Sequence, residues 1–243
     1  MLKHIKEFEE FYGTQINEDL SDMWETFKRK IVDLFSKDDS EKSPNKILNP
    51  KLKSKSDGLF SGDHMLYLPH QQGPAGTAEL INVIRGKTKL TQSLRSKLLG
   101  NIPSSDKRYA TVKSGKDIEA AKAFMEYQKE TWDNYKKEAL TKIKEPQNAN
   151  IKKAIEKIPN RNLPFDFLAT VAYKESRFNP NPPTNKSFRG LFQIGDLAWK
   201  QLKINFPEKY KGAKAPLDPF KNAQAGHDNL SNAFRMFDKK ITA

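Results

Sequence analysis

The segment between residues 165 and 202 restricts the fold of this 243-residue chain more than any other segment. It opens with an apolar run that carries one glutamate at helical spacings of three, four and seven: Leu168, Val171, Ala172 and Glu175. These spacings predict an α-helix with the glutamate on its apolar face. The helix has to end soon after Glu175, because residues 179–183 read Asn-Pro-Asn-Pro-Pro and proline has no N–H to donate.

A carboxyl group on an apolar helix face has a specific chemical use. Loss of hydration raises the pKa of a carboxylic acid and keeps its proton in place near neutral pH, as a general acid requires. Glu175 is therefore the candidate catalytic acid of this chain. The alternative is a frayed last turn in which the same side chain is solvated.

The chain resumes after the prolines with residues 190–194, Gly-Leu-Phe-Gln-Ile. Gly190 permits a close backbone approach, and Gln193 offers both a donor and an acceptor. These properties suit the wall of a substrate groove. The alternative is a surface loop followed by the start of an ordinary helix.

These pieces resemble the soluble lytic transglycosylases, a branch of the lysozyme-like superfamily. The family pattern is E-S-x-F-x-P followed by G-x-x-G-L-M-Q-I, and here residues 175–180 read Glu-Ser-Arg-Phe-Asn-Pro, with Trp199 after the second motif. Phe188 stands where the family usually has alanine, and Phe192 stands where methionine is common. The resemblance implies an all-α, mainly helical, lysozyme-like transglycosylase domain.

A third motif lies near the end of the chain. Residues 217–226 resemble the family segment D-P-x-x-N-I-x-A-G, which normally continues A-x-Y-L. Asn229 occupies the position of the family tyrosine, which helps to orient the catalytic region. His227 is either a substitute contributor or, as we expect, a solvated helix residue.

A fourth motif lies about a hundred residues before Glu175 rather than after it. Residues 66–76 resemble the Y-L-x-H-Q-Q-G-x-G-G sequence of phage-encoded transglycosylase-like proteins. Because the termini of compact domains are often close and exposed, the displaced order implies a circularly permuted domain. It adds His70 and Gln71 to the groove. The alternative is a glycine–proline turn before a helix that begins near Thr77.

The mechanism that the resemblance implies needs one carboxyl group. Glu175 would protonate the glycosidic oxygen between MurNAc and GlcNAc and then take the proton of the MurNAc C6 hydroxyl, giving a 1,6-anhydro product. No cofactor is required. A hydrolase would need a second acid, and the candidates Asp166, Asp196 and Asp218 have no motif position. The residues expected to bind the glycan are Ser176, Gly190, Gln193, His70 and Gln71.

Composition favours an anionic partner other than nucleic acid. The formal net charge is +13 and the sequence pI is about 9.6, which suits an acidic cell envelope. The lysines are spread rather than clustered with aromatic residues, and no nucleic-acid motif is present. The absence of cysteine excludes disulfides and thiolate metal sites, and the four histidines show no metal-ligand spacing.

Helical periodicity predicts the organisation of the chain. A helical arm is expected over residues 1–45, a linker over 46–58, and the transglycosylase domain over 59–243, divided into a permuted groove half (59–145) and a catalytic half (146–243). Residues 101–116 are expected to form a loop, and no sheet is expected. The helices are expected over residues 3–12, 17–35, 77–84, 90–99, 118–143, 151–158 and 223–237, besides the helix that carries Glu175. The helix over 118–143 has an apolar stripe with an aromatic centre, which is expected to be core rather than a ligand site: Ile118, Ala121, Phe124, Met125, Trp132, Tyr135 and Leu140.

The N-terminus has no continuous apolar segment of the kind found in secretory signals, and no stretch is long and apolar enough to cross a bilayer. We therefore expect a phage-encoded lytic transglycosylase that acts from the virion or in the host periplasm and cell wall. Its expected partners are peptidoglycan strands and, through the arm, phage tail or internal virion proteins. The alternatives are a lysozyme-like muramidase and a non-catalytic virion protein that retains the fold.

Overall fold

The computed structural model describes residues 63–183, 187–212 and 214–242. The predicted arm (1–45) and linker (46–58) lie outside the described residues. No helix among the described residues has the length and apolar character needed to span a membrane.

The described chain is mainly helical, as predicted. Its elements in order are α4 (His64–Gln72), α5 (Pro74–Ile84), α6 (Gln92–Gly100), α7 (Tyr109–Ser114), α8 (Asp117–Lys142), the 3₁₀ turn η2 (Pro146–Asn148), α9 (Ala149–Glu156), α10 (Phe165–Ser176), β1 (Phe188–Arg189), β2 (Ile194–Gly195), α11 (Asp196–Asn205) and α12 (Pro219–Thr242). Strands β1 and β2 pair antiparallel, with Phe188 opposite Gly195.

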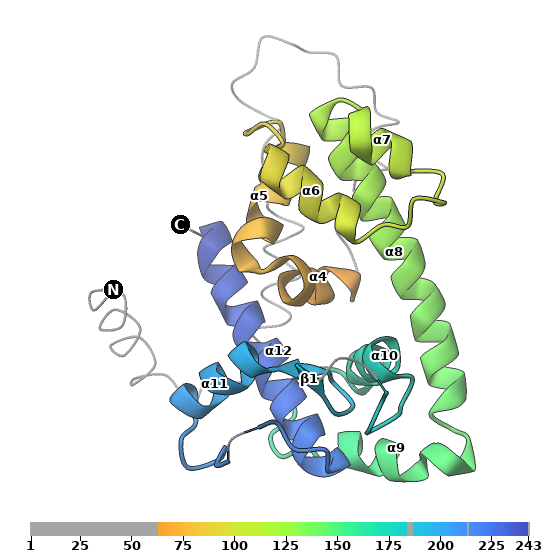
Figure 1. The fold of residues 1–243 in the computed structure, drawn as a ribbon, viewed down its shortest axis with the longest axis vertical. Helices are drawn as coiled ribbons and strands as arrows, with labels where there is room; N and C mark the ends of the chain where they lie inside the picture. Colours follow the sequence, from red (N-terminus) through yellow and green to blue (C-terminus); the bar gives the residue numbers. More distant parts are fainter. Residues whose placement is uncertain (1–62, 184–186, 213, 243) are drawn as a thin grey trace.

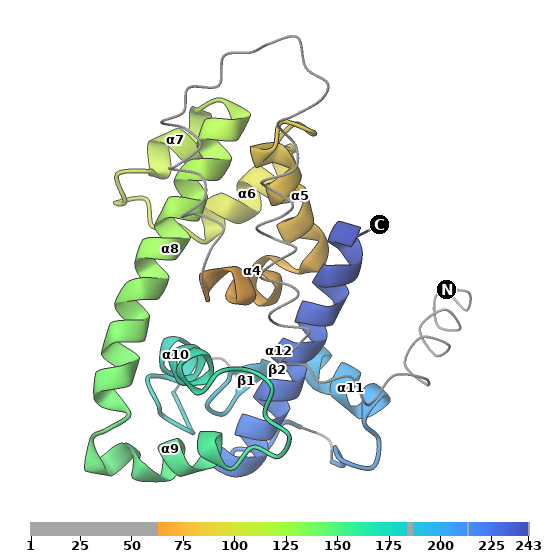
Figure 2. The same ribbon diagram turned by 180° about the vertical axis from the view of Figure 1, so that it is seen from behind.

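Two long helices frame the molecule. Figures 1 and 2 show α8 along one side and α12 along the other, with α4 and α10 between them. Helix α10 packs on α8, while α4 and α5 contact both α8 and α12. The buried apolar residues of all these helices form one hydrophobic core. The two predicted halves of the domain, residues 59–145 and 146–243, therefore share a core.

The apolar stripe predicted for α8 is buried along most of its length. Phe124 and Met125 are fully buried, and Trp132 is 2% exposed. Ile118 differs from the prediction, because it lies in the first turn of the helix and is 40% exposed. The aromatic centre of the stripe is thus part of the core, as the periodicity predicted.

Two local expectations were wrong, and one expected helix begins earlier than predicted. The region 101–116 contains helix α7, whose Val112 is buried. Residues 188–195 form a short antiparallel hairpin, which periodicity does not predict because each strand has only two residues. The helix expected near Thr77 begins at Pro74, where the missing N–H costs nothing in a first turn. The preceding residues also form a helix, α4, and Gly73 with φ of 76° separates the two.

Candidate active site

Glu175 lies in the last turn of α10, at the edge of the core. The helix buries Leu168, Val171 and Ala172, and the Glu175 side chain is 21% exposed. Arg177 ends the helix in the left-handed conformation, with φ of 55°, while its N–H donates to the Tyr173 carbonyl at 2.8 Å. The carboxyl group therefore lies on the predicted face and still reaches solvent.

The nearest partner of Glu175 comes from α4. The hydroxyl of Tyr67 donates to Oε1 of Glu175 at 2.7 Å, across 108 positions of sequence. Burial, and then the neighbouring Glu175 charge, raises the pKa of Tyr67 well above its usual value of 10.0. The phenol is therefore a fixed O–H donor at neutral pH. Tyr67 was not predicted to be a site residue, although it is the tyrosine of the segment that resembles Y-L-x-H-Q-Q-G.

Aromatic packing holds Tyr67 in place. The Tyr67 ring is 5.3 Å from the Trp132 ring, and Trp132 is 5.4 Å from the Phe167 ring of α10. All three side chains are at least 95% buried, since their exposed fractions are 5%, 2% and 1%. Helices α4, α8 and α10 thus meet directly behind the carboxyl group, and this contact fixes the position of the hydroxyl.

His70 lies one turn after Tyr67 and faces the same carboxyl group. Its Nε2 is 3.8 Å from Oε1 of Glu175, which is too long for a direct hydrogen bond. Burial lowers the pKa of His70, and Lys174 lowers it further, while Glu175 opposes the shift. The imidazole is therefore neutral at pH 7 and offers one donor and one acceptor to a bound group.

Two other predicted groove residues make local contacts. Gln71 is half-buried, and its Oε1 accepts a 3.4 Å hydrogen bond from Gln72. The hydroxyl of Ser176 donates to the Ala172 carbonyl at 2.9 Å, and the residue is 6% exposed. Ser176 thus has a contact inside its own helix, whereas a groove-lining hydroxyl was expected. The structure brings His70 to Glu175 and shows no contact of Gln71 or Ser176 with it among the described residues.

The predicted close approach at Gly190 is to the side chain of Asn222. A Cβ at Gly190, where φ is 73°, would collide with the Asn222 amide group. Asn222 is fully buried in the first turns of α12, where its Oδ1 accepts from the Phe192 N–H at 2.9 Å. Its Nδ2 donates to the Pro216 carbonyl at 2.9 Å. The asparagine of the third motif therefore holds the glycine turn of the second.

Gln193 closes the same turn. Its backbone is left-handed, with φ of 45°, and its Nε2 donates to the Gly190 carbonyl at 2.8 Å. Next to it, Phe192 packs so closely on α12 that a Cβ at Gly226 would overlap its ring. The loop between β1 and β2 thus packs against α12 at two places: Gly190 of the loop lies on Asn222, and Phe192 of the loop lies on Gly226 of α12.

His227 is buried, so the expectation of a solvated helix residue was wrong. It is 3% exposed; its Nδ1 lies 2.9 Å from Asp228 and its Nε2 lies 2.8 Å from Oδ1 of Asn162. Burial alone would raise the pKa of Asp228, but hydrogen bonds from His227, Lys209 and Tyr210 outweigh it and lower the value. This cluster holds α12 to two loops, and periodicity could not reveal it because the partners are distant in sequence.

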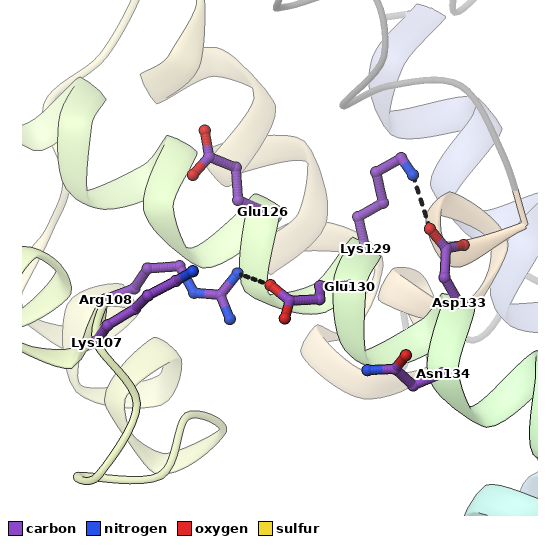
Figure 3. Close-up of a pocket in the computed structure, with 7 residues that line it drawn as sticks. All are labelled: Lys107, Arg108, Glu126, Lys129, Glu130, Asp133 and Asn134. Atoms are coloured by element: carbon purple, nitrogen blue, oxygen red, sulfur yellow. Dashed lines mark hydrogen bonds and ion pairs between the residues drawn. The ribbon is translucent and has the colours of Figure 1, made fainter.

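A surface depression of about 500 Å³ lies between the middle of α8 and the residues that precede α7 (Figure 3). Its lining is charged and internally paired: Arg108 contacts Glu130 at 2.8 Å, and Lys129 contacts Asp133 at 2.7 Å. None of the predicted site residues lines it. In the part of the chain that the structure describes, no group of His, Asp and Glu side chains could hold a metal ion.

Comparison with known proteins bears on the second part of the chain. Residues 152–243 match the family model described as "Transglycosylase SLT domain". The matched region contains Glu175, the turn at residues 190–194 and Asn222, but it excludes Tyr67 and His70. Neither the comparison with curated proteins nor that with solved structures finds a match. The described chain is therefore mainly helical, and its residues 152–243 match the SLT transglycosylases, whose domain is lysozyme-like; this match supports lytic transglycosylase activity on peptidoglycan.

Proposed function

We propose that this chain is a lytic transglycosylase that cleaves the β-1,4 bond between MurNAc and GlcNAc and forms 1,6-anhydroMurNAc. The observation that carries the proposal is the 2.7 Å hydrogen bond from Tyr67 to Oε1 of Glu175. It places Glu175, which belongs to the matched segment, against the fixed hydroxyl donor of Tyr67 at a partly buried position. Such an arrangement orients a single acid for proton transfer.

In the first step Glu175 acts as the acid. Tyr67 occupies Oε1, and no described residue donates to Oε2, so the proton is presented on Oε2. Oε2 protonates the glycosidic oxygen, and the bond from that oxygen to MurNAc C1 breaks. The Tyr67 hydrogen bond stabilises the carboxylate that results, because a hydrogen bond to a charged acceptor is stronger than one to a neutral acceptor.

In the second step the carboxylate acts as the base. Oε2 takes the proton from the C6 hydroxyl of the same MurNAc, and the C6 oxygen attacks C1 to close the 1,6-anhydro ring. The nucleophile belongs to the substrate, so its effective concentration is high and no water has to be positioned. Glu175 regains its proton and is ready for another cycle.

The positions of the other carboxylates argue against a two-acid hydrolase. Asp166 is nine residues before Glu175 on α10, which is about 13 Å along a helix axis. Oδ1 of Asp218 accepts from the Lys221 N–H at the start of α12. Asp196 is exposed in the first turn of α11. None of the three has a described contact with Glu175.

We also propose that α4 and α5 supply a groove half that precedes the catalytic helix in a permuted order. Helix α4 packs between α8 and α12, and Tyr67 and His70 point to Glu175 from it. His70 then binds a polar group of the glycan beside the carboxyl group, with Gln71, Gly190 and Gln193 as further proposed contacts. Phage-encoded action on the host wall, from the virion or during lysis, remains part of the proposal. The net charge of +13 supports it, because cell envelopes are acidic.

Mass spectrometry of peptidoglycan digested by the purified protein tests the reaction. The expected fragments end in 1,6-anhydroMurNAc. Fragments with reducing MurNAc ends would establish a muramidase instead; they are about 18 mass units heavier because one water has been added, and about 20 heavier after borohydride reduction adds two hydrogens. An unchanged digest would indicate a non-catalytic protein. Detection of the chain among the proteins of purified phage particles would test the virion location.

A further inference from the structure

Lys174 places a cation one tyrosine ring away from the proposed catalytic carboxyl group. Its Nζ lies 4.8 Å from the ring centroid of Tyr67 and 5.3 Å from that of Tyr135. Tyr67 is the same residue whose hydroxyl contacts Glu175. Because the two rings come from α4 and α8, the ammonium group is held at the junction of three helices.

The ammonium group forms no ion pair with any residue that the structure describes. Among the residues that the structure describes, no hydrogen bond or ion pair involves Nζ of Lys174. Arg177, three residues later, also lies over tyrosine rings, but it forms an ion pair with Glu138 at 3.2 Å. Lys136 likewise pairs with Asp63 at 2.7 Å. Lys174 thus differs from its basic neighbours.

Burial adds to this difference. The Lys174 side chain is half-buried, and its loss of water lowers the pKa of the amine below the usual 10.5, an effect that Glu175 opposes and Arg177 increases. Aromatic faces attract a cation but accept no conventional hydrogen bond from it. An incoming carboxylate would therefore supply acceptors for the N–H donors of the ammonium group, which no described residue supplies.

The substrate of the proposed function has a carboxylate on one of its two sugars. MurNAc carries a lactyl ether, which ends either in a free carboxylate or in a stem peptide with carboxylates of its own, whereas GlcNAc carries none. We propose that Lys174 binds a carboxylate on the lactyl arm of the MurNAc that undergoes cleavage. This inference rests on the proposed function. Lys174 would then determine which sugar of the glycan strand lies at Glu175. By binding the lactyl arm it places a MurNAc there, with the C6 hydroxyl that the reaction needs, and not a GlcNAc.

The test measures glycan binding in the Glu175→Gln background, so that the ligand is not consumed. Three tetrasaccharides are compared by calorimetry: one with acidic stem peptides, one freed of peptide so that the lactyl carboxylate is exposed, and neutral chitotetraose. Lys174→Met is expected to weaken binding of the acidic ligands about tenfold, which is about 1.4 kcal/mol. Chitotetraose binding is expected to stay unchanged, and the tenfold difference should shrink at high salt.

Matched variants separate a charge effect from a folding effect. Lys174→Arg keeps the cation and should retain most of the affinity. Lys113→Met removes an exposed lysine on α7, at the far end of α8 from α10 (Figure 1), and should change nothing. Loss confined to the peptide-bearing ligand would identify a stem carboxylate, and loss with the peptide-free ligand would identify the lactyl carboxylate.

Two results would overturn the inference while leaving the proposed function intact. One is unchanged affinity of Lys174→Met for both acidic ligands. The other is an equal loss for acidic ligands and chitotetraose, which would mean a structural role. Failure of the Glu175→Gln protein to bind any of the three glycans would instead overturn the proposed function and the inference with it.

Discussion

The hydroxyl of Tyr67 and the carboxyl group of Glu175 are joined by a 2.7 Å hydrogen bond although they lie 108 positions apart. The bond connects the segment that matches SLT transglycosylases with a helix outside the matched residues. Glu175 therefore has a hydrogen-bond partner that its own segment does not supply.

Glu175→Gln should reduce glycan cleavage by about three orders of magnitude or more, because the amide can neither donate nor accept the transferred proton. The fold should persist, since the amide oxygen can still accept from Tyr67. Loss of turbidity of purified cell walls measures the rate, and circular dichroism checks the fold. Glu126→Gln, an exposed change on α8, is the matched control. Near-normal activity of Glu175→Gln would refute its assignment as the acid.

Tyr67→Phe should lower kcat by about tenfold to a hundredfold. It removes a hydrogen bond to a charged acceptor, worth about 1.5–3 kcal/mol, and keeps the ring that packs on Trp132. Steady-state kinetics on soluble glycan fragments gives kcat. Tyr109→Phe, on α7, serves as a control for the loss of a phenol. An unchanged kcat in Tyr67→Phe would show that the hydrogen bond has no part in the reaction.

His70 should make the stability of the protein depend on pH on the acidic side of neutrality. Its pKa is lowered from 6.5 in the folded state, so below pH 6.5 the unfolded chain binds a proton that the folded chain does not. The free energy of unfolding should therefore fall as pH decreases from 6.5 until the folded imidazole is also protonated. Urea titrations at several pH values measure this. His70→Asn should flatten the profile in this window, and an unaltered slope would contradict the prediction.

Gly226→Ala should lower the free energy of unfolding by about 1–3 kcal/mol, the usual cost of overpacking, because the added methyl group would overlap the Phe192 ring. Gly100→Ala is the matched control. It lies in α6 with no atom within 4 Å of an added Cβ, and alanine favours helix over glycine. Chemical denaturation compares the two. Equal stability of both variants would mean that the Phe192 loop is free to move away from α12.

Deletion of residues 1–45 should leave cleavage intact, whereas deletion of residues 1–80 should abolish it. The longer deletion removes α4 and with it Tyr67, His70 and part of the core. Wall-lysis assays on both proteins, with circular dichroism for folding, measure the difference. Full activity from a chain that starts at Gln147 would show that the first half of the domain is not part of the groove, and the proposed permutation would fail.

The helical pattern was readable from the sequence because burial on one face of a helix imposes a local spacing. Leu168, Val171 and Ala172 predicted α10 and the face that carries Glu175. The aromatic stripe of α8 was predicted to be core in the same way, and Trp132 is core. Two-residue strands and the short helix α7 were missed, because elements of this length leave too few positions for a period to appear.

The contacts around Glu175 could be predicted from the sequence only in part. Glu175 and His70 were selected from motifs, and Gly190 was selected for a close approach, yet the atoms that approach it belong to Asn222. Tyr67 was not selected, although it makes the shortest described contact of the carboxyl group. A motif names residue types along one segment, whereas a hydrogen bond needs two segments brought to within about 3 Å.

The sequence by itself determined that the apolar stripes of α8 and α10 are core, that prolines follow the end of α10, and that one glutamate occupies an apolar stripe. Tertiary structure alone decided that Tyr67 donates to Glu175, that Asn222 fills the space at Gly190, and that His227 is buried against Asn162. The reason is physical. Spacing along a helix follows from backbone geometry that every chain shares, but contacts between distant segments follow from how whole helices pack, and that packing depends on all the side chains of the core together.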